Sequence, residues 1–223
     1  MSENISAEQF EESDGVQDWR VVEDGAGAFF RTASFADSAK LVRLVSELPG
    51  VNEHPPKVDV RHDGVSFRLI TTSDKWYGMT TRDVELARQI SGVARTIGLQ
   101  ADPTAVQSVL VIPGATDITK VVPFWRAMLG YEPRADSPDE DLVDPRRRGP
   151  SFWFEKLDEP HASAGGGAIH LAIFVPYEQA EARIQAALAA GGHMVRDEFA
   201  PSWWTLADSA GNEADIATTK SRG

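Results

Sequence analysis

Apolar and polar residues follow a mixed strand and helix pattern over residues 19–98. Alternating positions bounded by Gly, Pro and Asp predict strands, and an apolar stripe repeating every three to four residues predicts helices. In chain order the predicted elements are strands 19–23 and 28–35, helix 36–48, strands 57–61 and 65–71, and helix 81–97. Short turns join the strands and each helix has one apolar face. This order predicts a small α+β unit with helices on one face of an antiparallel sheet.

The second half of the chain contains an internal repeat. Residues 107–113, Gln-Ser-Val-Leu-Val-Ile-Pro, are echoed by residues 170–176, His-Leu-Ala-Ile-Phe-Val-Pro. Each copy opens with a potential metal ligand, closes on a proline, and is followed by a helical pattern and a glycine. The strands predicted here are 106–112, 130–134, 151–157, 193–197, 203–207 and 213–217, and the helices are 121–129 and 177–190. The repeat predicts two similar modules that face a shared site.

Composition along the chain divides it into four parts. Residues 1–15 are acidic with few apolar partners, and we expect a disordered tail. Residues 16–98 form the first unit, and residues 99–104, polar and containing a proline, are the expected linker. The duplicated unit is expected over residues 105–218.

Bulk composition limits the class of protein. With 42% hydrophobic and 25% charged residues among 223, the chain has the make-up of a soluble globular protein, and no apolar run approaches the ~20 residues of a membrane span. It has no cysteine, which excludes disulfides and thiolate sites, and its first residues lack a secretory pattern, so a cytoplasmic location is expected. The net charge of −12 argues against nucleic acid as a partner.

Several motifs of the first unit occur in a recognisable order. They are Trp19, the strand Phe30-Arg31-Thr32-Ala33-Ser34-Phe35, Glu53-His54-Pro55, Gly78-Met79-Thr80-Thr81-Arg82-Asp83 and Glu85-Leu86-Ala87. In order and spacing, residues 16–98 resemble the pterin-4a-carbinolamine dehydratases. The resemblance implies elimination of water from a 4a-hydroxytetrahydropterin to give the quinonoid dihydropterin, without a metal.

That chemistry needs a base for a ring N–H proton and an acid for the departing hydroxyl, roles suited to imidazoles. The family pattern has a His-His-Pro, and here Glu53 replaces the first histidine while His54 matches the second. A third family histidine falls on Asp74 when the alignment starts from the glycine and on Thr72 when it starts from the strand. The resemblance therefore implies the catalytic set Glu53, His54 and Asp74. A buried carboxylate can act as acid or base, so both turnover and a pocket without turnover stay open.

The duplicated unit resembles the vicinal-oxygen-chelate, or glyoxalase-like, superfamily, in which paired βαβββ modules surround one divalent metal. The resemblance covers residues 105–218, and four positions match the metal ligands of that superfamily: Gln107, Glu155, His170 and Asp215. An amide oxygen, two carboxylates and an imidazole suit Zn, Ni, Fe, Mn or Co. Such a metal would act as a Lewis acid on a substrate with paired oxygens.

Three functions follow from these patterns. The first is a lyase that resembles 4a-hydroxytetrahydrobiopterin dehydratase, fused to a glyoxalase-like domain. The second is a metal-dependent lyase, isomerase or dioxygenase that carries a degenerate dehydratase domain. The third is a non-catalytic protein that binds a small molecule. All three imply a small-molecule partner, pterin-like or with vicinal oxygens, and neither a membrane nor nucleic acid; a homo-oligomer is compatible with each.

Overall fold

The computed structural model describes residues 3–23, 25–73, 76–119, 122, 131–147, 149–158, 169–189, 192–207 and 213–221. The chain forms two compact units, residues 1–107 and residues 108–222, with the last residue grouped with the first unit. Among the described helices, none combines the length and the apolar character that crossing a membrane requires. The predicted helix 121–129 lies almost wholly outside the described residues.

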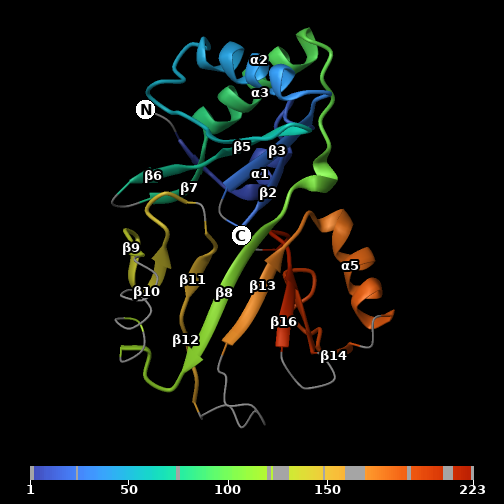
Figure 1. Ribbon diagram of the computed structural model, residues 1–223. Coiled ribbons are helices and arrows are strands. Elements are labelled where there is room, and N and C mark those ends of the chain that lie inside the picture. Colours follow the sequence, from blue (N-terminus) through green and yellow to red (C-terminus); the bar gives the residue numbers. More distant parts are fainter. Residues whose placement is uncertain are drawn as a thin grey trace. The chain divides into compact units, whose positions relative to one another are not determined.

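The first unit is built on a four-stranded antiparallel sheet. Its strand order is β2 (Arg20–Val22), β3 (Gly25–Arg31), β5 (Gly64–Leu69), β4 (Lys57–Val60). Two helices, α2 (Phe35–Ser46) and α3 (Thr81–Thr96), pack together on one face of this sheet (Figure 1). The α+β class and the helices on one face are confirmed. The largest side chains buried in this core are Trp19, Phe10, Phe30, Phe67, Leu41, Leu69 and Ile90.

A second, three-stranded sheet lies in the same unit. Its order is β1 (Asn4–Ile5), β7 (Trp76–Thr80), β6 (Thr71–Ser73), and all pairs are antiparallel. The sequence predicted neither β1 nor β7. It also predicted residues 65–71 as one strand, whereas the structure divides this stretch between β5 and β6.

The predicted disordered tail is wrong over residues 3–12. These residues form β1 and the helix α1 (Ala7–Glu11), which a Ser6–Gln9 capping box starts. Phe10 is fully buried in the core of the unit. The acidic residues that suggested disorder lie mostly on the exposed side of α1, and a single aromatic anchor orders the segment because it buries a large apolar surface.

The predicted linker 99–104 is hydrogen-bonded to the first unit. Arg31 N donates to Gln100 O at 3.0 Å, and Asp102 N donates to Phe29 O at 2.8 Å. A short 3₁₀ helix, η1 (Pro103–Ala105), follows. The division between the units therefore falls after residue 107, later than composition alone suggested.

The second unit is one long mixed sheet. Its strand order is β14, β15, β16, β13, β8, β11, β10, β9. The bounds are β8 (Ser108–Ala115), β9 (Glu132–Arg134), β10 (Ser137–Val143), β11 (Ser151–Trp153), β12 (Glu155–Lys156), β13 (Ile169–Phe174), β14 (His193–Arg196), β15 (Trp203–Ala207) and β16 (Glu213–Ala217). The helix α5 (Tyr177–Ala189) follows β13. The acidic strand β10 was not predicted.

The repeat is visible in the topology of this sheet. In each half the first strand pairs in parallel with the fourth, and the third and second strands follow outward. The two first strands, β8 and β13, pair antiparallel at the centre (Figure 1). The paired βαβββ architecture is confirmed by this order. Leu142, Phe152 and Phe154 form a buried cluster in the first half.

Candidate functional site

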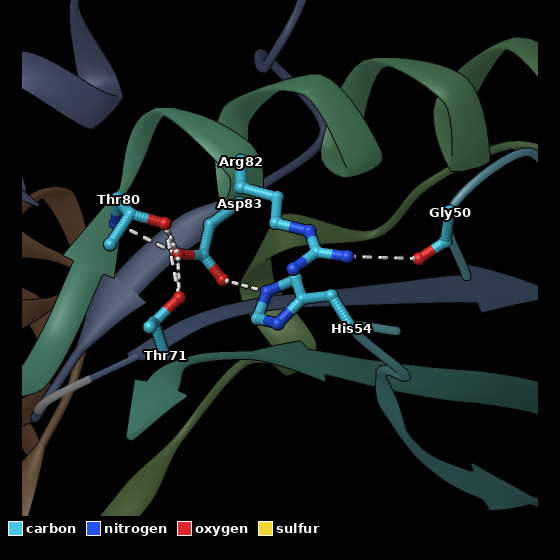
Figure 2. A network of polar contacts seen from close by, with 6 residues as sticks. All are labelled: Gly50, His54, Thr71, Thr80, Arg82 and Asp83. Atoms are coloured by element: carbon cyan, nitrogen blue, oxygen red, sulfur yellow. Dashed lines mark hydrogen bonds and ion pairs between the residues drawn. The ribbon is translucent and has the colours of Figure 1, made fainter. Parts of the chain in front are cut away.

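His54 is placed by the turn that ends α2. Gly50 adopts φ of +77°, a left-handed conformation that glycine tolerates, and the chain reverses there. His54 N then donates to Gly50 O at 3.2 Å. The same carbonyl faces Arg82, whose Nη2 lies 3.5 Å away (Figure 2). The imidazole of His54 is 13% exposed, so the turn holds it largely buried with a small part open to solvent.

His54 contacts Asp83, which lies in the first turn of α3. Its carboxylate is completely buried, and Oδ1 lies 2.7 Å from His54 Nε2. Oδ2 accepts three further hydrogen bonds: from Thr71 Oγ1 at 2.8 Å, Thr80 N at 2.7 Å and Thr80 Oγ1 at 2.8 Å (Figure 2). The Thr80 N–H lies at the start of the helix and has no partner within it. Asp83 accepts its hydrogen bond, so one side chain both caps α3 and orients His54.

The charge of Asp83 follows from these bonds. Burial alone would raise the pKa of the Asp83 carboxyl, but the hydrogen bonds from His54, Thr71 and Thr80 outweigh burial and hold that pKa below its ordinary value. An ionised Asp83 accepts hydrogen bonds only, which assigns the proton of neutral His54 to Nε2. Nδ1 then carries the free lone pair, and the pair forms a carboxylate-oriented base.

Among the described residues, the other predicted catalytic positions are exposed. Glu53 is exposed on the turn next to His54. Thr72 is exposed in β6, and Asp74 lies outside the described residues. In the sequence, Asp83 stood out only as the last residue of the motif Gly78-Met79-Thr80-Thr81-Arg82-Asp83, without a catalytic role. Its spacing from His54, 29 residues with four strands in between, gave no signal of the contact.

In the second unit, His170 and Asp215 come together from neighbouring strands. His170 Nε2 lies 2.9 Å from Asp215 Oδ1, with side chains 17% and 10% exposed. Thr205 Oγ1, itself buried, donates to the same Oδ1 at 2.7 Å. The His170–Asp215 contact lacks hydrogen-bond alignment, so the buried Nε2 has no hydrogen-bond partner among the described residues. It is a close ion pair rather than a directed bond.

Acidic neighbours set the charge of His170. Burial alone would lower the pKa of the His170 imidazole, but Asp215, with Glu213 and Glu155 further away, outweighs burial and raises the pKa. Two of the four predicted metal ligands therefore lie in contact, and a third acts on them through its charge.

The four predicted metal ligands are not gathered at one point. His170 pairs with Ile112, whereas Ser108, the neighbour of Gln107, pairs with Phe174. Gln107 is thus five residues along β8 from the level of His170, about 17 Å at the usual rise of a strand. Glu155 pairs with Gly114 on the other side of β8 from β13.

The number of ligands gathered in one place is also too small for a metal site. No group of three or more His, Asp or Glu side chains arranged to hold a metal occurs within the described ranges. The described residues therefore do not fit the four-ligand divalent metal centre that the resemblance implied.

Comparisons with known proteins agree with this division. The family described as "Pterin 4 alpha carbinolamine dehydratase" matches residues 3–93, and the family described as "Glyoxalase-like domain" matches residues 109–217. Among solved structures, a glyoxalase/bleomycin resistance protein/dioxygenase superfamily member from Vibrio splendidus 12B01 aligns with 51% of this chain and 99% of its own, at 15% identity and a TM-score of 0.33.

Three curated relatives share the name "Putative pterin-4-alpha-carbinolamine dehydratase". The protein of Mycolicibacterium vanbaalenii is 32% identical over 75 residues, which are 34% of this chain and 78% of the relative. The protein of Mycobacterium avium is 33% identical over 75 residues, with the same coverage. The protein of Nocardia farcinica is 37% identical over 78 residues, 35% of this chain and 80% of the relative. Through its first unit the chain belongs to the pterin-4a-carbinolamine dehydratase family, and that unit is fused to a glyoxalase-like domain.

Proposed function

We propose that the first unit is a lyase that eliminates water from a pterin 4a-carbinolamine, as a 4a-hydroxytetrahydrobiopterin dehydratase does. The observation that carries the proposal is the His54–Asp83 pair. Nε2 of the largely buried imidazole lies 2.7 Å from Oδ1 of the fully buried carboxylate. An imidazole is the side chain best suited to take and return a proton near neutral pH.

The reaction balances around one proton relay. The neutral His54 accepts the ring N–H proton on Nδ1, the electron pair of that N–H bond forms the C=N bond, and the C4a–O bond breaks. The departing hydroxide takes a proton and leaves as water, so no net proton is gained or lost. Asp83 stabilises the imidazolium that forms in between, because its negative charge lies against Nε2.

The proposal also requires a group that gives a proton to the departing hydroxide. Glu53 is the neighbour of His54 and is exposed on the same turn, and we propose it as the group that protonates the departing hydroxyl. Asp74 keeps the same role as a proposal on the sequence alone. If neither acts, the imidazolium of His54 returns the proton itself.

A dehydratase assay on single variants tests the proposal. His54→Ala is expected to reduce kcat to the uncatalysed background, and Glu53→Gln is expected to reduce it only in part. His62→Ala is the matched control, because His62 lies in the same unit with a side chain that is 87% exposed. Equal rates for wild type and His54→Ala would sink the proposal.

A second function belongs to the glyoxalase-like unit. We propose that it binds a small oxygen-bearing molecule beside the His170–Asp215 pair, where an imidazole and a carboxylate lie 2.9 Å apart with side chains 17% and 10% exposed. The incomplete ligand set favours binding that does not use all four predicted ligands.

A further inference from the structure

Residues 3–19 contact α3 along its length, and residues 3–11 make the contact at its first residue. The contacts fall on helix positions 81, 88, 91 and 95, whose spacings of seven, three and four residues place them on one face of the helix. The contacting pairs are Glu3 with Thr81, Asp14 with Arg88, Trp19 with Ser91, and Asp18 with Arg95. The segment thus fixes the helix from its first residue to its last turn.

The first of these contacts lies next to the catalytic pair. Thr81 N donates to Glu3 O at 3.0 Å, and Glu3 N donates to Thr81 Oγ1 at 3.2 Å. Thr81 is the first residue of α3, and a backbone N–H there has no partner within the helix. Glu3 supplies that partner from 78 residues away in sequence.

The strand next to Glu3 also pairs with Thr80. Strand β1 pairs with β7 so that Asn4 faces Thr80. Thr80 in turn gives Asp83 two of the three hydrogen bonds on Oδ2. A shift of the junction between β7 and α3 would therefore move the carboxylate that holds His54.

The segment is itself firmly anchored. Phe10 is fully buried, and Ser6 N donates to Gln9 Oε1 at 2.8 Å while Gln9 N donates to Ser6 Oγ at 3.1 Å. An anchored segment can hold the junction in place, whereas a loose tail could not.

We propose that residues 3–11 are a positioning segment of the dehydratase site: through the Glu3–Thr81 contact they hold the Thr80–Asp83 turn and, through it, the orientation of His54. The inference rests on the proposed function for its kinetic readout and adds to it a part of the chain outside the motifs that carry the family resemblance.

Thr81→Val tests the inference, because it removes the hydroxyl that Glu3 N reaches and keeps the shape of the side chain. Loss of one hydrogen bond of ordinary strength predicts a decrease in kcat of about fivefold. KM is expected to stay close to that of wild type, since Thr81 is not among the residues proposed to act on the substrate. Thr81→Ser restores the hydroxyl and is expected to restore kcat. Amide exchange at residues 79–83 is expected to be faster in Thr81→Val than in wild type.

Thr96→Val is the matched control, because Thr96 Oγ1 donates to Gly92 O at the other end of the same helix. Deletion of residues 1–5 is a second variant and is expected to have a larger effect in the same direction. The inference is overturned if Thr81→Val and the deletion keep wild-type kcat and exchange, or if Thr96→Val matches Thr81→Val. If wild type shows no dehydratase activity, the proposed function fails, and amide exchange at residues 79–83 with the ¹⁵N signal of the His54 Nε2–H decides the inference alone.

Discussion

His54 Nε2 and Asp83 Oδ1 lie 2.7 Å apart, and the carboxylate that orients the imidazole is the same one that caps α3. One side chain therefore couples the start of a helix to the chemistry of the site. Because Asp83 is completely buried, water cannot replace its bonds when they are lost.

Asp83→Asn is expected to reduce kcat by roughly 10- to 150-fold, because a hydrogen bond to a charged group contributes about 1.5–3 kcal/mol. The amide keeps the shape of the carboxylate but cannot stabilise the imidazolium. Steady-state kinetics with the proposed carbinolamine substrate measure the effect. Undiminished kcat in a folded Asp83→Asn protein would show that the carboxylate is a helix cap alone.

The lowered pKa of Asp83 predicts how the first unit responds to acid. A carboxyl whose folded pKa lies below its ordinary value of 3.8 contributes stability that is complete above that value and is lost as pH falls through the folded pKa. The difference in free energy of unfolding between wild type and Asp83→Asn should therefore shrink as pH falls from 5 to 3. Urea unfolding at several pH values, followed by fluorescence, checks this; a constant difference would contradict it.

Asp141 in β10 predicts the opposite sign in the second unit. Burial raises the pKa of the Asp141 carboxyl and outweighs its bond with Ser137 and the nearby Arg134 guanidinium, 3.2 Å away. Its stabilising contribution is present below its ordinary pKa and is lost as pH rises through the folded pKa. Asp141→Asn, which mimics the protonated form, should gain stability relative to wild type between pH 4 and pH 7. The same urea series measures it, and a relative loss over that range would refute it.

Two glycines of the first unit provide a paired test of packing. A Cβ added at Gly64 would lie 2.2 Å from Phe29 Cζ and 2.8 Å from Phe30 O, so Gly64→Ala is expected to lower the free energy of unfolding by about 1–3 kcal/mol. Gly92 has nothing within 4 Å of its Cβ position and lies inside α3. Gly92→Ala is therefore expected to raise the free energy of unfolding by about 0.5–1 kcal/mol. Thermal or urea unfolding of both variants checks the sign of each.

The strand register of the second unit predicts which residues affect metal binding. Gln107→Ala is expected to leave the affinity for Zn²⁺ or Ni²⁺ unchanged from wild type, because Gln107 is about 17 Å along β8 from the level of His170. His170→Ala is expected to weaken whatever binding is present. Calorimetry with metal-free protein measures both. An equal loss in the two variants would show that all four predicted ligands act together.

Much of the fold could be read from local pattern. The two helices of the first unit, its paired strands and the repeat in the second unit follow from periodicity and turn residues, which act over a few neighbouring positions. The motif around His54 was also visible, because residue types and spacing within one segment survive in the sequence. The N-terminal segment was misjudged because a composition average over fifteen residues hides one buried phenylalanine.

The sites depended on contacts that no local pattern encodes. Gln107 and His170 occupy equivalent places in the repeat, yet β8 and β13 pair antiparallel, so the equivalent ends of the two strands lie apart. The sequence showed Asp83 only as part of a motif, and the fold brought His54 to its Oδ1 while Thr71 and Thr80 bond its Oδ2. The sequence alone determined most of the elements and the candidate groups, because these depend on neighbouring residues. Only the tertiary structure decided which groups meet, because strand register and helix packing join residues that are far apart in the chain.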